Sequence, residues 1–449
     1  MKFDESIFKA YDIRGVVKLE LNAEIARAVG RALADLLETP GAVAVGYDMR
    51  PASVEYATAV REGLVMQGRE VIDIGLVTSD MIYFVVGSLD LAGGAMVTAS
   101  HNPGQYDGIK LCRRGAAPIG EDTGLAVIEH ALKQDEYKAV PAQGKVTKRD
   151  ITEAWIGHTL TFVEAPKWPE YKIAVDAGNG MAGLIVPRLE AKIPPKVTEM
   201  YFELDGTFPN HVANPLVIEN LKAIVATIRD NDLDLGIAFD GDGDRAFLID
   251  EQGDRLSGSV LAAIIAESML ARYPGSTILY NAICSRIVPE TILAHGGKAV
   301  RTRVGHSFIK AKMREYDAPF AGEHSGHFYF RDNYYADSGL IAALVGVDVL
   351  AKSGLKLSEL AAKYRKYYNS DEINVAVTDK VAKLEAIKTA YSDGEIDDLD
   401  GLTVSYPEWW FNVRPSNTEP VLRLNIEASS TQELKTRTEE LLELLKFDK

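Results

Sequence analysis

The chain has 449 residues, which exceeds one ordinary hydrophobic core and predicts two to four domains at roughly 100–200 residues per domain. Hydrophobic residues make up 47% of the sequence and charged residues 25%, which is typical of a folded chain and excludes a largely disordered one. The 49 basic and 65 acidic residues give a net charge of −16. Such a surface repels a phosphate backbone, so we expect no nucleic-acid partner.

Cysteine content and the first residues point to a compartment. Two cysteines, Cys112 and Cys284, are too few for a disulfide framework or a Cys-based zinc site. The segment MKFDESIFKAYDIRG has two acidic residues and no apolar core, which is atypical of a secretory leader. No run approaches ~18 uninterrupted apolar residues, so we expect no membrane span. These features predict a protein of the reducing cytoplasm.

The first 75 residues alternate between helix and strand patterns. Residues 22–38 predict a helix that begins at Asn22, residues 42–48 a buried strand, residues 53–68 a helix capped by Ser53 and closed by Gly68, and residues 70–75 another strand. This alternation favours an α/β layer structure with a largely parallel sheet.

The alternation resumes after a polar stretch, residues 133–150, which we interpret as a connector. Strands are predicted in 172–180 and 233–244, then a helix in 261–273 and a strand in 276–281. The last 80 residues differ, with a strand at 373–378, two strands around a basic turn in 408–428, and a helix at 431–446. The pattern predicts α/β units followed by a small α+β domain.

The segment DGDGDR, Asp240 to Arg245, places three carboxylates at a spacing of two on a glycine-rich turn. Asp240, Asp242 and Asp244 can all face one hard divalent cation. An EF-hand loop begins similarly, and Glu251 holds its twelfth position, but Arg245 stands where that loop needs glycine. A solvated acidic turn without metal is the remaining alternative.

The segment TASHNP follows an apolar strand pattern and contains Ser100 and His101. A serine after a strand suits a nucleophile or a phosphate carrier, whereas a plain turn before Pro103 suits the same residues. Adjacent serine and histidine do not by themselves make a catalytic triad.

Two further loops are rich in hydrogen-bonding groups. GEHSGH, residues 322–327, offers Glu323, Ser325 and two imidazoles suited to sugar hydroxyls, with a structural turn as the alternative. His324 and His327 do not by themselves predict a zinc site, because no second cluster completes a ligand set. RPSNTEP, residues 414–420, offers a guanidinium, hydroxyls and an amide that suit a phosphate, or else a plain exposed turn. Smaller candidates are Tyr11 and Arg14 in KAYDIRG, Lys110 in YDGIK, and Arg303, Gly305 and His306 in RVGHSFIK.

Taken in this order, the segments resemble the α-D-phosphohexomutase superfamily of phosphomannomutase/phosphoglucomutase type, over essentially the whole chain. The resemblance implies three similar α/β domains with mixed, helix-flanked sheets and a C-terminal α+β domain around a central cleft. We place the domains at 1–145, 146–250, 251–366 and 367–449, with the phosphoserine, metal, sugar and phosphate loops respectively.

The resemblance also implies roles for residues. Ser100 would be the phosphoserine, and an oxygen of its phosphate would join Asp240, Asp242 and Asp244 around Mg²⁺. Proton transfer and charge stabilisation would fall to Arg14, His101, Lys110, Arg245 and His327. Substrate would be bound by Tyr11, Arg303, Gly305, His306, Glu323, Ser325, Arg414, Ser416, Asn417 and Thr418.

The implied activity is exchange of hexose 1-phosphate and hexose 6-phosphate through a hexose 1,6-bisphosphate. Glucose or mannose 1,6-bisphosphate would act as activator, and the chain would be a monomer or a homodimer. GEHSGH resembles the loop of phosphomannomutases and dual-specificity members, so mannose phosphate is favoured, with glucose phosphate activity. Phosphoglucomutase or phosphoglucosamine mutase is the alternative main activity. A Mg²⁺-dependent sugar phosphatase and a non-enzymatic calcium- or sugar-binding module are rivals from other classes.

Overall fold

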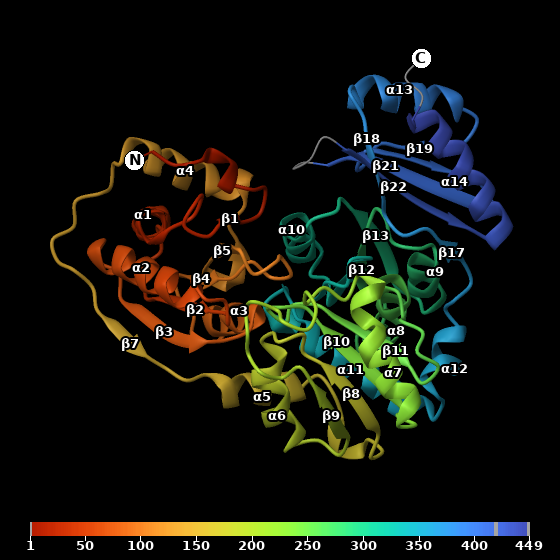
Figure 1. Cartoon of the computed structure of the whole chain (residues 1–449), viewed down its shortest axis with the longest axis horizontal. Helices are drawn as coiled ribbons and strands as arrows, with labels where there is room; N and C mark the ends of the chain where they lie inside the picture. Colours follow the sequence, from red (N-terminus) through yellow and green to blue (C-terminus); the bar gives the residue numbers. More distant parts are fainter. Residues whose placement is uncertain (1, 417–420, 447–449) are drawn as a thin grey trace. The chain divides into compact units, whose positions relative to one another are not determined.

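The computed structural model describes residues 2–416 and 421–446 (Figure 1). The chain divides into two compact units. Unit 1 contains Met1–Leu256 and Ser325–Ser358, and unit 2 contains Ser257–His324 and Glu359–Lys449. Across the described residues, every helix is too short or too polar to cross a membrane.

The first sheet of unit 1 is mixed. Its strands are β1 (Ile13–Val16), β2 (Val43–Tyr47), β3 (Val71–Leu76), β4 (Gly93–Val97), β5 (Tyr106–Arg113), β6 (Ala117–Pro118) and β7 (Val146–Lys148). They lie in the order β1-β5-β4-β2-β3-β7, and β6 pairs with β5. Strands β4, β2, β3 and β7 are parallel, as the alternation predicts, whereas β5 is antiparallel to β1 and β4. The β4–β5 hairpin carries the TASHNP segment between its strands.

Four helices accompany this sheet: α1 (Ala23–Leu36), α2 (Ser53–Met66), α3 (Ser79–Ser88) and α4 (Leu125–Gln134). Asn22 caps α1 as predicted, because its side chain accepts a hydrogen bond from the Ile25 amide at 3.0 Å. The predicted cap at Ser53 is wrong. Ala52 occupies the cap position, and the Ser53 hydroxyl is directed instead to buried carboxylates.

Helices α1 and α2 pack closely because two glycines face the opposite backbone. A Cβ atom at Gly30 would lie 2.3 Å from the Val60 carbonyl oxygen, and one at Gly63 would lie 2.0 Å from the Arg27 carbonyl oxygen. Only glycine permits such an approach. The contact holds the helix pair together, and the pair buries an apolar face against the sheet.

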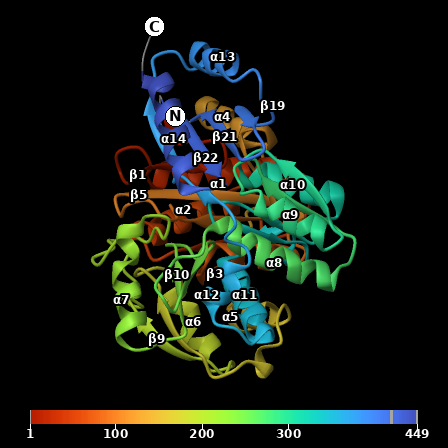
Figure 2. The same ribbon diagram turned by 90° about the vertical axis from the view of Figure 1, so that its right-hand side faces the viewer.

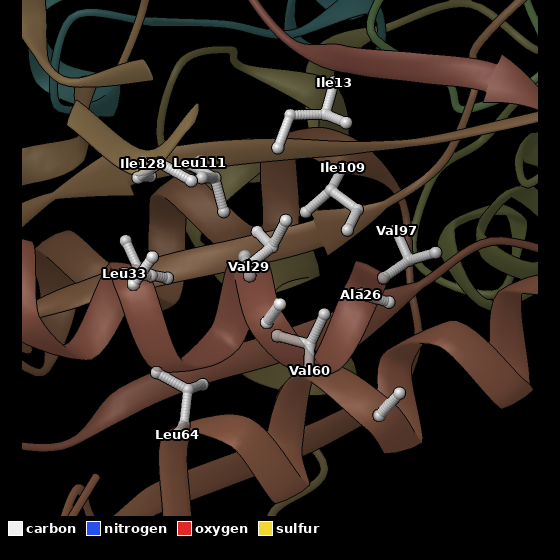
Figure 3. Close-up of a cluster of buried hydrophobic side chains, with 14 of the residues drawn as sticks. Ile13, Ala26, Val29, Leu33, Val60, Leu64, Val97, Ile109, Leu111 and Ile128 are labelled. Carbon is white, nitrogen blue, oxygen red and sulfur yellow. The ribbon is translucent and has the colours of Figure 1, made fainter. Parts of the chain in front are cut away.

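The core beneath α1 and α2 is aliphatic. Figure 3 shows Val29 and Leu33 of α1, Val60 and Leu64 of α2, and side chains of β1, β4 and β5 meeting in one cluster. Burying an aliphatic side chain of this size contributes roughly 1.5–3 kcal/mol. The cluster therefore fixes the strands whose ends carry the serine loop.

The predicted connector at 133–150 is only partly irregular. Helix α4 extends to Gln134, and β7 within the stretch adds to the sheet beside β3. The sequence pattern did not predict β7, because the stretch is polar and all three residues of the strand are exposed. An edge strand of this kind carries no hydrophobic signal.

The second sheet of unit 1 has the order β11-β10-β8-β9. Its strands are β8 (Lys172–Asp176), β9 (Lys196–Met200), β10 (Leu235–Phe239) and β11 (Ala246–Asp250), and its helices are α5 (Thr152–Leu160), α6 (Ala182–Glu190) and α7 (Lys222–Asp230). Strands β10, β8 and β9 are parallel, and β11 is antiparallel to β10. The β10–β11 turn is DGDGDR.

Unit 1 is completed by a later segment. It contains β15 (Phe328–Phe330), β16 (Ala336–Asp337) and α11 (Gly339–Ser353). Helix α11 is anchored to the segment after α5, because Asp348 accepts hydrogen bonds from the Trp168 indole at 2.8 Å and the Glu164 amide at 3.0 Å. Helix α12 (Leu357–Ala362) then carries the chain from unit 1 into unit 2.

Unit 2 begins with a parallel arrangement. Strands β12 (Thr277–Asn281), β13 (Lys298–Thr302) and β14 (Phe320–Gly322) are accompanied by helices α8 (Gly258–Arg272), α9 (Ile287–Ala294) and α10 (His306–Tyr316). Strand β12 pairs in parallel with both β13 and β14. The predicted helix at 261–273 and strand at 276–281 are confirmed with small shifts of their ends.

The last part of unit 2 is an antiparallel sheet with two helices. Its strands are β17 (Tyr368–Asn369), β18 (Ile373–Ala376), β19 (Glu395–Asp397), β20 (Leu402–Ser405), β21 (Trp409–Pro415) and β22 (Val421–Ala428), with α13 (Lys380–Ala390) and α14 (Thr431–Lys446). Figure 2 shows α14 along β22, and its buried Leu441 and Leu445 join the core of this sheet. The predicted α+β pattern of two strands around a turn, then a helix, is confirmed.

Candidate active site

Ser100 lies three residues after the end of β4 in a left-handed backbone conformation, with φ of 52°. Its amide donates to the Thr98 hydroxyl at 2.9 Å, and its own hydroxyl donates to Asp240 Oδ2 at 2.9 Å. The His101 Nδ1 atom is 3.1 Å from the same hydroxyl. A non-glycine residue in this region is uncommon and occurs where surrounding contacts enforce it.

Arg50 enforces that conformation and is a residue that sequence reasoning missed. One guanidinium nitrogen donates to the carbonyl oxygens of Ser100 at 2.7 Å and Asn102 at 2.6 Å. The other donates to the carbonyl oxygens of Pro103 and Tyr106 at 3.1 and 2.9 Å. Arg50 is 2% exposed. The buried guanidinium therefore shapes the whole loop that presents Ser100.

The three carboxylates of DGDGDR converge. Asp240, Asp242 and Asp244 are buried, and one oxygen from each lies within 4.8 Å of the others. Oδ1 of Asp242 and Oδ1 of Asp244 are buried without a hydrogen-bond partner among the described residues. Buried carboxylate oxygens need a partner, and Mg²⁺ prefers oxygen ligands of this kind. The residues present therefore fit a divalent cation.

Cationic groups hold the remaining oxygens of the triad. Lys110 Nζ on β5 lies 2.7 Å from Asp242 Oδ2 and 2.7 Å from Asp244 Oδ2. The Arg245 amide donates to Asp240 Oδ1 at 3.1 Å, and its Nε donates to Asp240 Oδ2 at 3.0 Å. Within the described residues, Oδ1 of Asp242 and Oδ1 of Asp244 are thus the triad oxygens that accept no hydrogen bond.

Burial and neighbouring charges give the carboxyl groups of Asp240 and Asp244 different pKa values. Burial and the Asp244 charge raise the pKa of Asp240 to about 7. Burial also acts upward on Asp244, but Lys110 and His327 outweigh it and lower the pKa of Asp244 to about 2. For Lys110, the carboxylates of Asp242 and Asp244 outweigh burial and raise its pKa well above the usual value. Lys110 therefore stays cationic beside the triad.

Arg14 and His101 are part of the same cluster in unit 1. Arg14 on β1 donates to Asn102 Oδ1 at 2.7 Å and forms an ion pair with Asp12. Burial, together with the positive charges of Arg245 and Arg14, lowers the pKa of His101 well below its usual value. The imidazole beside Ser100 is therefore neutral.

His327 reaches this cluster from the later segment of unit 1. Its Nδ1 atom is 3.0 Å from Asp337 Oδ2 and 3.9 Å from Asp244 Oδ1. An isolated β-bridge also joins its backbone to Arg245. The carboxylates of Asp244 and Asp337 outweigh burial and raise the pKa of His327. Asp337, which the sequence did not single out, orients this ring.

The EF-hand alternative for DGDGDR is wrong. The DGDGDR turn joins two antiparallel strands, and Glu251 accepts hydrogen bonds from Ser358, so the loop is not an EF-hand. The two histidines of GEHSGH have different partners. His324 lies 3.1 Å from the Ser259 hydroxyl in unit 2, whereas His327 belongs to unit 1 and faces Asp337.

Unit 2 contains a separate part of the predicted site. Glu323 follows β14, is 2% exposed, and accepts hydrogen bonds from the Gly305 amide and the Asn281 side chain, both at 3.2 Å. His306 begins α10 directly after Gly305, and the Arg303 guanidinium lies 4.6 Å from the Phe308 ring centre. The structure therefore joins the 303–306 turn to Glu323.

The remaining candidates are more dispersed. Tyr11 lies half-buried before β1, and Ser325 lies half-buried at the start of the later segment of unit 1. Arg414 on β21 forms an ion pair with Glu372 at 2.6 Å. Ser416 is 6% exposed, and its carbonyl oxygen accepts from Lys380 at 3.0 Å. Asn417 and Thr418 lie outside the described residues.

A serine, a carboxylate triad and buried cations in one cluster are typical of metal-dependent phosphoryl-transfer enzymes. Four family models of phosphoglucomutase/phosphomannomutase match the chain: α/β/α domain I over 5–138, domain II over 154–253, domain III over 257–367 and the C-terminal domain over 372–444. The chain therefore belongs to the phosphoglucomutase/phosphomannomutase family.

Individual relatives match the sequence or structure of this chain over nearly their full lengths. A chain named "Phosphohexose mutases" from Xanthomonas campestris pv. campestris is 42% identical, with 98% of this chain and 99% of the relative covered. An Escherichia coli phosphomannomutase is 38% identical, with 98% of this chain and 99% of the relative covered. A solved phosphoglucomutase/phosphomannomutase family protein from Burkholderia thailandensis has a TM-score of 0.91 and 32% identity, over 99% of this chain and 98% of that one.

These findings confirm the predicted superfamily, the architecture of three α/β domains and one C-terminal domain, and the class of phosphohexomutase isomerase. The domain boundaries at 145/146, 250/251 and 366/367 and the central cleft stay predictions. The two compact units do not coincide with the four matched domains, because Ser325–Ser358 packs with unit 1.

Proposed function

We propose that the chain interconverts mannose 1-phosphate and mannose 6-phosphate, and also the glucose phosphates, through a phosphate carried on Ser100. The observation that carries this proposal is the contact between Ser100 and the triad, with the serine hydroxyl 2.9 Å from Asp240. The phosphomannomutase and phosphohexose mutase relatives support the mannose substrate. The main alternatives are phosphoglucomutase and phosphoglucosamine mutase activity.

The proposed chemistry transfers the phosphoryl group twice. A sugar hydroxyl attacks the phosphorus, the bond from phosphorus to the Ser100 oxygen breaks, and the hydroxyl proton passes to a nearby base. The resulting hexose 1,6-bisphosphate reverses its orientation in the site. Its other phosphate is then transferred back to Ser100. Added glucose or mannose 1,6-bisphosphate should therefore restore enzyme that has lost its phosphate.

Asp240, Asp242 and Asp244 would hold Mg²⁺ together with an oxygen of the phosphate on Ser100. When bound, the ion neutralises charge on the transferring phosphate and draws electron density from it. The cationic Lys110 and Arg245 add fixed positive charge around the triad, to which they are bonded at 2.7 and 3.0 Å. Arg14, His101 and His327 are the candidates for proton transfer and charge stabilisation.

The substrate-binding roles also belong to the proposal. Glu323 and Ser325 would bind sugar hydroxyls, and Tyr11, Arg303, Gly305 and His306 would add contacts to the substrate. Arg414, Ser416, Asn417 and Thr418 would hold the phosphate that is not reacting. Glu372 already pairs with Arg414 at 2.6 Å, so a bound phosphate must share or replace that partner.

We also propose a cytoplasmic setting, which suits two buried cysteines that form no disulfide and the metabolic role of the family. The oligomeric state, monomer or homodimer, is part of the same proposal. Its direct check is the molar mass from light scattering at working concentration.

The test replaces Ser100 with alanine. We expect S100A to fold, to carry no phosphate by intact mass, and to lose nearly all turnover of mannose 1-phosphate. Ser353→Ala is a matched control, because that hydroxyl bonds backbone groups at the end of α11, the Leu350 carbonyl oxygen and the Leu355 amide, and its loss should leave phosphate and turnover intact. Full mutase activity in S100A would overturn the proposal, and free phosphate release without isomerisation would favour a phosphatase.

A further inference from the structure

The metal loop is contacted by three consecutive residues at the start of α3, Thr78, Ser79 and Asp80, which we call the TSD segment. The Ser79 hydroxyl donates to Asp242 Oδ2 at 2.5 Å, and the Ser79 amide donates to the Asp242 carbonyl oxygen at 3.0 Å. Ser79 is 1% exposed. One residue of the first α/β layer thus binds both the side chain and the backbone of a metal-loop aspartate.

The TSD segment is itself held rigidly. Asp80 accepts hydrogen bonds from Thr78 and from the Ser338 hydroxyl, the latter at 2.5 Å. Ser338 in turn caps α11 by accepting from the Ile341 amide at 3.1 Å. Ser79 therefore stands on a buried network that reaches the start of α11, and its own position is fixed.

The backbone of the metal loop also depends on this segment. Gly243 has φ of 77°, and a Cβ atom there would lie 3.1 Å from Thr78 Cγ2. The turn between Asp242 and Asp244 therefore packs directly on Thr78. The Ser79 amide lies in the first turn of a ten-residue helix, whose positive end also favours a nearby carboxylate.

The two carboxylate oxygens of Asp242 have different surroundings, and this difference shows how the Ser79 contact can affect metal binding. Oδ2 is bound by Ser79 and Lys110, whereas Oδ1 is buried without a partner among the described residues. Lys110 alone would leave the carboxylate free to rotate toward Asp244, which shares the same ammonium. A second donor from another direction fixes the plane of the carboxylate.

We propose that Ser79 is a positioning residue of the divalent-metal site, fixing Asp242 through Oδ2 so that Oδ1 stays available to the cation. The inference rests on the proposed metal role of the triad and assigns a residue that touches neither substrate nor ion. Partners of metal ligands that hold them in place typically change metal affinity about 10–100-fold when removed.

The test measures Mn²⁺ binding alone, by electron paramagnetic resonance titration of the full chain with Ser100 unphosphorylated, verified by intact mass. Ser79→Thr and Ser79→Val are the matched pair, because they add the same volume and differ only in the hydroxyl. We expect S79T to bind within about threefold of the wild type and S79V to bind roughly tenfold or more weakly. Thr159→Val is the control for general loosening, because its buried hydroxyl donates to the Ile156 carbonyl oxygen of its own helix at 2.9 Å rather than to the TSD segment or the triad.

Each outcome is decisive. Equal Mn²⁺ affinities of S79T and S79V overturn the inference, and so does an equal loss in T159V. A wild-type chain that does not bind Mn²⁺ overturns the proposed metal role itself, which is a distinguishable failure. Excess Mg²⁺ should restore turnover of S79V, since the triad remains complete.

Discussion

At the scale of single residues, the two oxygens of each triad carboxylate have different partners, and this difference defines the role of Lys110. Oδ2 of Asp242 and Oδ2 of Asp244 are bound by Lys110, whereas their Oδ1 atoms accept no hydrogen bond within the described residues, and His327 Nδ1 is 3.9 Å from Asp244 Oδ1. Lys110 therefore competes electrostatically with a cation for the same acids, while it supplies positive charge for phosphoryl transfer.

Lys110→Met separates these two effects. We expect kcat to fall by about 10²-fold or more, because a fixed positive charge is lost where charge develops. The Kd for Mn²⁺ should stay the same or decrease, because the competing ammonium is gone. Titration and steady-state kinetics check both, and a strong loss of metal affinity with unchanged kcat would contradict this assignment.

His211 offers a pH-dependent test in unit 1 that does not involve the metal loop. Its ring bonds Asp176 and the Val212 carbonyl oxygen, both at 3.0 Å, and these partners outweigh burial and raise its pKa. A raised pKa means that the folded state binds the proton more tightly than the unfolded state. The stabilisation is complete below about pH 6.5 and disappears as pH rises through the folded-state pKa.

We therefore expect His211→Gln to lower the free energy of unfolding most at pH 5.5 and progressively less toward pH 8.5. Urea unfolding of both proteins across this range measures the difference. A difference that is constant with pH, or that grows with rising pH, would contradict a proton bound preferentially in the folded state.

At the scale of elements, local signals predicted the helices and strands that are amphipathic or buried. Asn22 and the apolar face of α1 were sufficient for that helix, and the apolar run LGIAF was sufficient for β10. Strand β7 was missed because its residues are exposed, and the cap at Ser53 was wrong because its hydroxyl has buried partners 5 and 54 residues away.

The same limit applies to the site. The candidate catalytic and metal-binding residues stand in recognisable motifs, whereas the residues that hold them in position do not. Ser79 bonds a residue 163 positions away, and Arg50 clamps carbonyl oxygens about 50 positions away. No local pattern marks a buried serine or arginine as a support, since the Arg50 contacts form only when distant segments of the first sheet come together, and the Ser79 contact only when the two sheets of unit 1 do.

The glycine contact between α1 and α2 gives a stability prediction at this scale. A methyl group at Gly63 would press on the Arg27 carbonyl oxygen, so the helices must separate. We expect Gly63→Ala to lower the free energy of unfolding by about 1–3 kcal/mol or more, despite the better helix propensity of alanine. Gly157→Ala on α5 is the control, because no atom lies within 4 Å of the added Cβ, and it should be neutral or stabilising by urea unfolding.

At the scale of the whole molecule, a metal bound only by the folded chain must raise its stability. We expect Mg²⁺ to raise the Tm in a concentration-dependent way, and EDTA to abolish turnover reversibly. Asp244→Asn should lose the Mg²⁺ dependence of Tm. An identical rise in that variant would place the stabilising ion elsewhere.

Ser100 is the carrier of the transferred phosphate in the proposed mechanism. The most direct measurement uses protein labelled with ³²P on Ser100, mixed with one equivalent of unlabelled mannose 1-phosphate and quenched within one turnover. The account predicts that label leaves the serine and appears first in a hexose 1,6-bisphosphate. Isomerised sugar phosphate formed while the label stays on the protein, or is released as inorganic phosphate, would contradict it.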